Sequence, residues 1–209
     1  LIKQMSFAIK KIARTRQLLL MLVLWGISFG SLMSLQGLWA VSWYQSSYGI
    51  TANEASTWAT LIGIGVMLGN FTGAHISKDS SKRKKVISIF CTIYSFSWIG
   101  LLLSIYTKAS IVLVGILGCV LGFAAGVSYV HLTAGVNDIS PKGKNGALFG
   151  MMNFFIFVCV IVYQWGTGVI LQNFPGMTEG IYTHEGYMIT FTVVTIIALL
   201  SLFAILFIK

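Results

Sequence analysis

The chain has 209 residues, of which 56% are apolar and only 9% are charged. An ordinary soluble domain has about 25% charged residues, so these charges are too few to cover a surface exposed to water. The net charge of +9 does not indicate nucleic-acid binding, because the basic residues lie in short gaps between long apolar runs rather than along one element. Composition therefore predicts an integral membrane protein that has no nucleic-acid partner.

Six apolar stretches are long enough to cross a bilayer, for which a helix needs about 20 residues. Barrel strands are about 10 residues long and alternate in polarity, so these stretches predict helices. We expect an all-α membrane protein whose six transmembrane helices form two three-helix repeats. The predicted spans are Leu18–Tyr44, Ala55–Ile76, Val86–Tyr106, Ser110–Ala134, Gly146–Leu171 and Tyr187–Ile208.

The gaps between the spans carry charge unevenly. Basic residues precede the first span, follow the second and fourth spans and end the chain, whereas Lys108 is the one basic residue on the other side. The acids Glu54, Glu179 and Glu185 also fall on that other side. By the positive-inside rule, both termini are expected to be cytoplasmic. We expect a multi-pass protein of a bacterial-type inner (plasma) membrane.

The segment before the first span, Leu1–Gln17, is basic and has apolar residues near helical spacing. It predicts either an amphipathic helix on the inner leaflet or a plain cytoplasmic linker, and the residues leave both open. It lacks the apolar core of a signal peptide, and the chain begins with Leu rather than Met. We therefore expect this chain to be part of a longer protein.

Several short motifs support one family resemblance. The segment Gly73–Lys85 (GAHISKDSSKRKK) is similar to the loop signature G-x-x-x-D-R-x-G-R-R/K, with Asp79 displaced toward the C-terminus relative to the family aspartate. The segments Gln36–Trp43, Asn137–Pro141 and Gly146–Phe154 add further similarity. Together with six spans whose ends share one side, they resemble the C-terminal half of a major facilitator superfamily transporter. The loop residues concerned are Gly73, Asp79, Lys82, Arg83 and Lys84.

The resemblance implies that these spans are the last six of a twelve-helix carrier, in which two bundles rock about a central site. It implies that the first and fourth spans line the cavity and that the second and fifth face the other half. In the family, the basic loop helps to latch one conformation through charge pairs. An orientation anchor held by anionic lipid headgroups is an equal alternative here.

Two spans carry glycine at every fourth position. Such a stripe lets another backbone approach closely. One interpretation is static packing within this bundle. The other is a sliding contact. For the stripe in the second span, that contact would be with the missing half; for the stripe in the fourth span, it would make the helix flexible beside a cavity. The stripes are Gly65, Gly69 and Gly73 in the second span and Gly118, Gly122 and Gly126 in the fourth.

The first span holds a candidate solute-contacting wall. Gln36, Trp39 and Trp43 are spaced i, i+3 and i+7, so they would share one face of a regular helix. Alternatively, Trp43 belongs to the aromatic belt that is expected at a membrane interface, and Gln36 packs against protein.

Other candidate cavity residues are Tyr129 in the fourth span and Asn153 and Gln164 in the fifth, because polar side chains are costly in lipid unless they face protein or water. We expect His131 to be a hydrated residue near the cytoplasmic interface. The span centres hold no carboxylate, lysine or arginine that could couple transport to an ion, so the coupling group is expected in the missing half.

The sequence has no paired carboxylates, Ser/His/Asp set, phosphate-binding loop or pair of histidines at metal-ligand spacing. Cys91, Cys119 and Cys159 lie in apolar runs and are expected to be free thiols. We therefore expect no enzyme activity, cofactor or metal.

The expected function is half of a secondary transporter, a symporter or antiporter, that moves a small polar or amphipathic solute by alternating access. Its partners would be the lipid bilayer, the solute, and either a missing N-terminal six-helix half or a second copy of this chain. The alternative is a non-transporting membrane module that assembles or senses through its glycine-rich helix faces.

Overall fold

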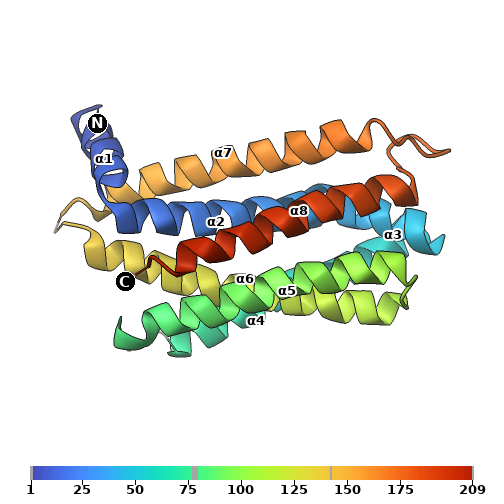
Figure 1. Ribbon diagram of the computed structural model, residues 1–209, viewed down its shortest axis with the longest axis horizontal. Helices are drawn as coiled ribbons and strands as arrows, with labels where there is room; N and C mark the ends of the chain where they lie inside the picture. The colour runs from blue at the N-terminus through green and yellow to red at the C-terminus, as the bar shows by residue number, and fades with distance from the viewer. Residues whose placement is uncertain (1, 77–79, 142, 209) are drawn as a thin grey trace.

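The computed structural model describes residues 2–76, 80–141 and 143–208. Within these ranges, six helices are long and apolar enough to cross a membrane, which confirms the predicted all-α membrane fold. The six run lengthwise through one elongated bundle, and the two ends of the chain lie at the same end of it (Figure 1).

The first span, Arg16–Tyr48, consists of three consecutive pieces: α2 (Arg16–Ser34), a π-helical turn η1 (Leu35–Trp39) and α3 (Ala40–Tyr48). The remaining spans are α4 (Ala52–Ile76), α5 (Arg83–Tyr106), α6 (Ile111–Ile139), α7 (Asn145–Leu171) and α8 (His184–Ile205). The helix α1 (Ile2–Arg14) precedes them, and a short 3-10 turn, η2 (Ser80–Lys82), leads into α5.

Several helix ends differ from the ends of the apolar runs because local capping sets them. The first span continues until Gly49, whose φ of 63° is the left-handed conformation that stops a helix. The second span starts early because the backbone N–H and the hydroxyl of Thr51 both donate to the Glu54 carboxylate at 2.9 Å. The last span starts at His184 because the Thr183 hydroxyl accepts the N–H of Gly186 at 3.3 Å.

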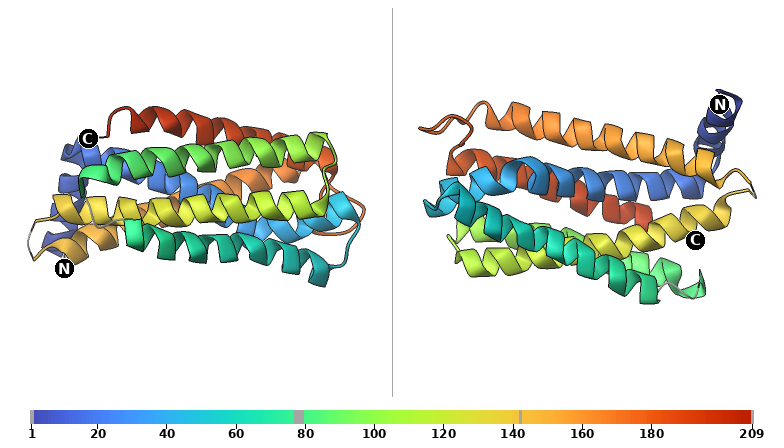
Figure 2. Two further views of the ribbon diagram at one scale, coloured as in Figure 1. Left: turned by 90° about the horizontal axis from the view of Figure 1, so that it is seen from below. Right: turned by 180° about the vertical axis from the view of Figure 1, so that it is seen from behind.

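The two three-helix repeats, formed by the first three spans and by the last three, are interlocked. The second span of each repeat packs along the first span of the other, so that α4 lies on α6 and α7 lies on α2. The third spans, α5 and α8, pack on each other, and each also contacts the first span of the other repeat. As a result α4 and α7 lie at opposite edges of the bundle, on either side of α2 (Figure 2).

The two glycine stripes face each other across the α4–α6 interface. A Cβ added at Gly69 would overlap the carbonyl of Phe123, and one added at Gly122 would overlap the carbonyl of Ile62. The backbones of the two helices are therefore in direct contact. Of the two interpretations of the stripes, the structure shows packing within this bundle, because each stripe packs against the helix that carries the other.

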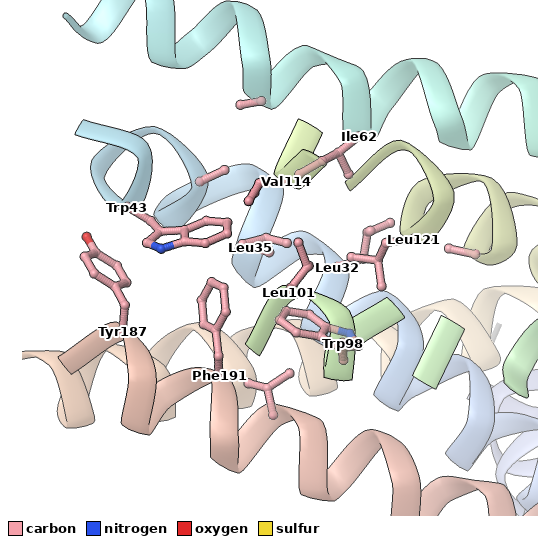
Figure 3. Packing of buried hydrophobic residues seen from close by; sticks show 14 of the residues in the cluster. Leu32, Leu35, Trp43, Ile62, Trp98, Leu101, Val114, Leu121, Tyr187 and Phe191 are labelled. Carbon is pink, nitrogen blue, oxygen red and sulfur yellow. The ribbon is translucent and has the colours of Figure 1, made fainter. Parts of the chain in front are cut away.

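Aromatic side chains fill the core near the α3 end. Phe191 of α8 lies edge-on to Trp43 and to Trp98, with ring centroids 4.7 Å and 5.5 Å apart. Tyr187 lies one turn from Phe191 and donates its hydroxyl to Ser42 at 2.8 Å. Figure 3 shows these rings converging between α3, α5 and α8. This cluster joins the first repeat to the second at that end.

The helix α1 lies across the opposite end of the bundle (Figure 1). Its residues Ala8 and Ile12 are buried in a second core cluster together with Leu18 of α2, Leu148 of α7 and Ile208. The segment before the first span is therefore a packed amphipathic helix over residues 2–14 rather than a plain linker. Its placement on the inner leaflet stays a prediction.

Candidate functional site

The first span is interrupted at the place where the candidate residues were predicted. Leu35–Trp39 forms a π turn, which holds one residue more than an α-helical turn. Such turns are rare and are frequent at functional sites. Because an inserted residue rotates everything after it, the i, i+3, i+7 argument for one shared face does not apply here.

The three side chains of the predicted wall reach three different helices. Gln36 packs on α4, where its Nε2 would be 2.9 Å from a Cβ added at Gly63. Trp39 turns to α7 and donates its indole N–H to the Thr167 hydroxyl at 2.8 Å. Trp43 is 1% exposed and belongs to the aromatic core. The prediction of one wall is therefore wrong, and Trp43 is a core residue rather than a solute contact or a belt residue.

Two of the predicted polar side chains do lie at the π turn. Gln164 comes from α7, and its Nε2 would lie 3.8 Å from a Cβ added at Gly37. Gln36 and Gly37 are neighbours in the turn, and Gly37 and Leu38 are exposed on its surface. Two amides from different repeats thus flank an open stretch of backbone. Each amide has both a donor and an acceptor that a solute can bind.

An aromatic group that sequence reasoning missed surrounds Tyr129 of α6. Phe29 of α2 lies edge-on to Tyr129 at 5.3 Å and to Phe157 of α7 at 6.1 Å, and Trp25 stacks on Tyr129 at 6.5 Å. Trp25, Phe29 and Gln36 recur at intervals of four and seven residues, which is the signal that could have identified this face of α2. Tyr129 itself is 9% exposed, so the predicted residue lies beneath the rings of α2.

The surface of α4 that turns away from α6 carries polar side chains among exposed apolar ones such as Met67 and Phe71. Asn53, Ser56, Thr60 and Asn70 are all exposed, and their spacing of three, four and ten residues keeps them on one side of the helix. Polar side chains on a membrane helix are costly when they face lipid. The Asn70 amide is therefore expected to face water or protein, and Gly63, which lies beside Gln36, is on the same side.

The predicted cavity residue Asn153 is exposed on α7. It lies one turn from Phe157, which is 54% exposed and contacts Phe29. The candidate residues Gln36, Gln164 and Asn153 are thus distributed between the two edge helices, α4 and α7, and Tyr129 is buried beneath them.

The loop motif is only partly described, because Asp79 lies outside the described residues. Gly73 packs on Val127 of α6, and Lys84 is exposed. Arg83 begins α5 and forms a salt bridge with Asp138, near the end of α6. An arginine at a helix N-terminus and an aspartate at a C-terminus are each unfavourable to the helix dipoles, so the pairing offsets both.

The Arg83–Asp138 pair was not predicted, although both residues lie in segments with family resemblance. Nearby, Asn145 donates its side-chain amide to Asn137 at 2.7 Å and so joins the start of α7 to the end of α6. His131 is 1% exposed, and neither of its ring nitrogens has a partner among the described residues. The expectation of a hydrated interfacial histidine is therefore wrong.

Comparison with protein-family models and with curated proteins finds no match for this chain. The fold and the packing together define a polytopic α-helical membrane protein that lies in a lipid bilayer.

Proposed function

We propose that this chain is half of a secondary transporter of the major facilitator type, which moves a small polar or amphipathic solute by alternating access. The observation that carries the proposal is the exposed Asn70 amide on α4, together with the Gln36 amide at the π turn. The Thr60 hydroxyl donates to the Ser56 carbonyl at 2.9 Å and is tolerated in lipid. The Asn70 amide would be costly there, whereas a solute path lined by water would hydrate it.

The interlocked repeats support the same proposal. The first spans of both repeats, which would line the path, lie in the middle, and α4 and α7 flank them at the edges. In each of these edge helices, only 28% of the 18-residue apolar stretch is buried inside the bundle. Both are therefore free to contact a second six-helix unit across the path.

The alternative of a non-transporting assembly module loses its main support. It rested on glycine-rich faces that would recruit another protein, but the two stripes are packed against each other within this bundle.

Water access to α4 tests the proposal without knowledge of the solute. Single cysteines at Thr60 and Asn70, in the intact protein with Cys91, Cys119 and Cys159 replaced by alanine, are treated with a hydrophilic thiol reagent. The matched control is Phe203→Cys on α8. The Phe203 side chain is 62% exposed on the surface of the bundle and would face lipid. We expect labelling at Thr60 and Asn70 and none at Phe203. Equal protection of all three positions would contradict a water-lined path.

A second test uses solute uptake once a solute is found. Gln36→Ala removes a half-buried amide at the π turn, and the loss of one hydrogen bond to the solute costs about 1–3 kcal/mol. We expect roughly a fivefold to hundredfold loss of apparent affinity at equal membrane abundance. Gln172→Ala, at the exposed end of α7, is the control and should leave uptake unchanged. Unchanged affinity in Gln36→Ala would place the solute elsewhere.

A further inference from the structure

Two adjoining cavities lie where α1 crosses the start of α7. One, of about 510 Å³, has a mixed lining of polar and apolar groups that includes Lys144, Gly143 and Phe7. The other, of about 570 Å³, is lined almost wholly by apolar side chains. The cavities share Gln4, Gly146 and Ala147, so they form one groove with a polar end and an apolar end. Their volumes are in the range of small-molecule sites.

The apolar end is formed by α1 on one side and α7 on the other. Met5 and Ile9 of α1 are each 45% exposed, and Phe154 of α7 is 59% exposed. All three line the groove, with Gly150 as part of its floor. The glycine matters because a Cβ added at Gly146 or at Gly150 would meet no atom within 4 Å. The groove is therefore open above both glycines.

The polar end carries positive charge. The Lys144 ammonium lies 4.1 Å from the centre of the Phe7 ring, so the side chain is held at the mouth of the groove by a cation–π contact. Lys10 lines a smaller hollow next to Met5 and Ile9. The start of α7 adds the positive end of a helix dipole at the same place.

We propose that this groove binds one anionic phospholipid, with the phosphate near Lys144 and one acyl chain along Met5, Ile9, Gly150 and Phe154. A cationic mouth joined to an apolar channel complements a molecule that is anionic at one end and hydrocarbon at the other. The location agrees, because α1 lies across the ends of the spans (Figure 1), and headgroups meet hydrocarbon near the ends of membrane-spanning helices. The bound lipid would hold α1 to the bundle, independently of any transported solute.

The test is native mass spectrometry of the purified full chain in detergent, titrated with phosphatidylglycerol or with phosphatidylcholine of the same acyl chains. We expect one phosphatidylglycerol to be retained preferentially. Lys144→Gln should weaken that binding about fivefold, because one lysine near anionic lipid contributes about that factor. The control Lys108→Gln, an exposed lysine in the turn after α5 and outside the basic loop, should have no effect. Equal retention of both lipids would overturn the proposal.

Filling the groove is the sharper test. Gly150→Leu places a side chain in open space, so the fold should be unaffected while the acyl chain is displaced and binding falls about tenfold. Gly166→Leu is the matched control, because that glycine lies on the same helix, also has no atom within 4 Å of an added Cβ, and is outside the groove. If Gly150→Leu fails to fold, Gly146→Val makes the same test. Unchanged lipid binding in the folded variant would overturn the proposal, as would full competition by glycerol phosphate without acyl chains.

Discussion

The α4–α6 and α2–α7 interfaces hold equivalent places in the two repeats, yet different chemistry closes them. Between α4 and α6, glycines on both helices bring carbonyl oxygens against the opposite backbone. Between α2 and α7, glycine is on one side only, and Gly26 and Gly30 of α2 accommodate Cys159 and Tyr163 of α7. Hence the first interface consists of contacting backbones and the second of side chains set into a glycine groove.

Polar bonding also distinguishes the α2–α7 interface. The Thr167 hydroxyl lies 2.9 Å from the Ser34 hydroxyl and 2.8 Å from the Trp39 indole nitrogen, and it donates to the carbonyl of Tyr163 at 2.6 Å. These bonds hold the π turn against α7. Two helices packed by backbone tolerate little change at the contact, whereas a contact made by side chains can relax. This contrast leads to four predictions about stability in detergent.

The largest effect is expected at the backbone contact. Gly122→Ala places a methyl group against the carbonyl of Ile62, which cannot rotate away, so the helices must separate. We expect a loss of about 3 kcal/mol of unfolding free energy, the upper end of the range for overpacking. The measurement is equilibrium unfolding of the purified chain. A loss below about 1 kcal/mol would show that this interface relaxes as easily as the other.

The next effect is expected at the polar bonds of the π turn. Thr167→Val keeps the shape of the side chain but leaves the Trp39 N–H and the Ser34 hydroxyl without their partner. We expect a loss of about 1–2 kcal/mol, because unpaired buried polar groups are costly. Thr167→Ser restores the hydroxyl and is the control. Because Thr167→Val keeps the methyl group, unchanged stability in that variant would show that the hydroxyl bonds do not hold the turn.

A smaller effect is expected at the side-chain contact. Gly26→Ala would place a Cβ 2.7 Å from the Cys159 sulfur, which can rotate. We expect a loss of about 1 kcal/mol. Cys159→Ala in the same chain should recover most of it, and a double-mutant cycle measures the coupling. Additive losses in the cycle would mean that the sulfur is not the obstacle.

The smallest effect is expected where a glycine meets nothing. Gly166→Ala on α7 adds a methyl group to open space. The unfolding free energy should be unchanged or higher by up to about 1 kcal/mol, because alanine favours a helix over glycine. Comparison with Gly122→Ala separates the effect of the helix–helix contact on the unfolding free energy from the effect of helix propensity. A large loss of unfolding free energy in Gly166→Ala would indicate that another helix or a second chain packs on that face.

The interior of the bundle was less predictable than its outline. Both glycine stripes were visible in the sequence, but a stripe states only that some backbone comes close, and the partner of each stripe is the other. Gln36, Trp39 and Trp43 were assigned to one face under the assumption of a regular helix. The π turn at Leu35–Trp39 has no distinctive composition, so the error was not avoidable from spacing alone.

The sequence by itself determined the number of spans and their approximate positions, because the need to cross hydrocarbon leaves a long apolar run little choice but a helix. Tertiary structure decided which faces of those helices meet. It paired Arg83 with Asp138, buried Trp43 beside Phe191 and turned Gln36 toward Gly63. Hydrophobicity is nearly uniform around each span, so it orients no face; backbone approach, polar bonds and one inserted residue determine the orientation instead.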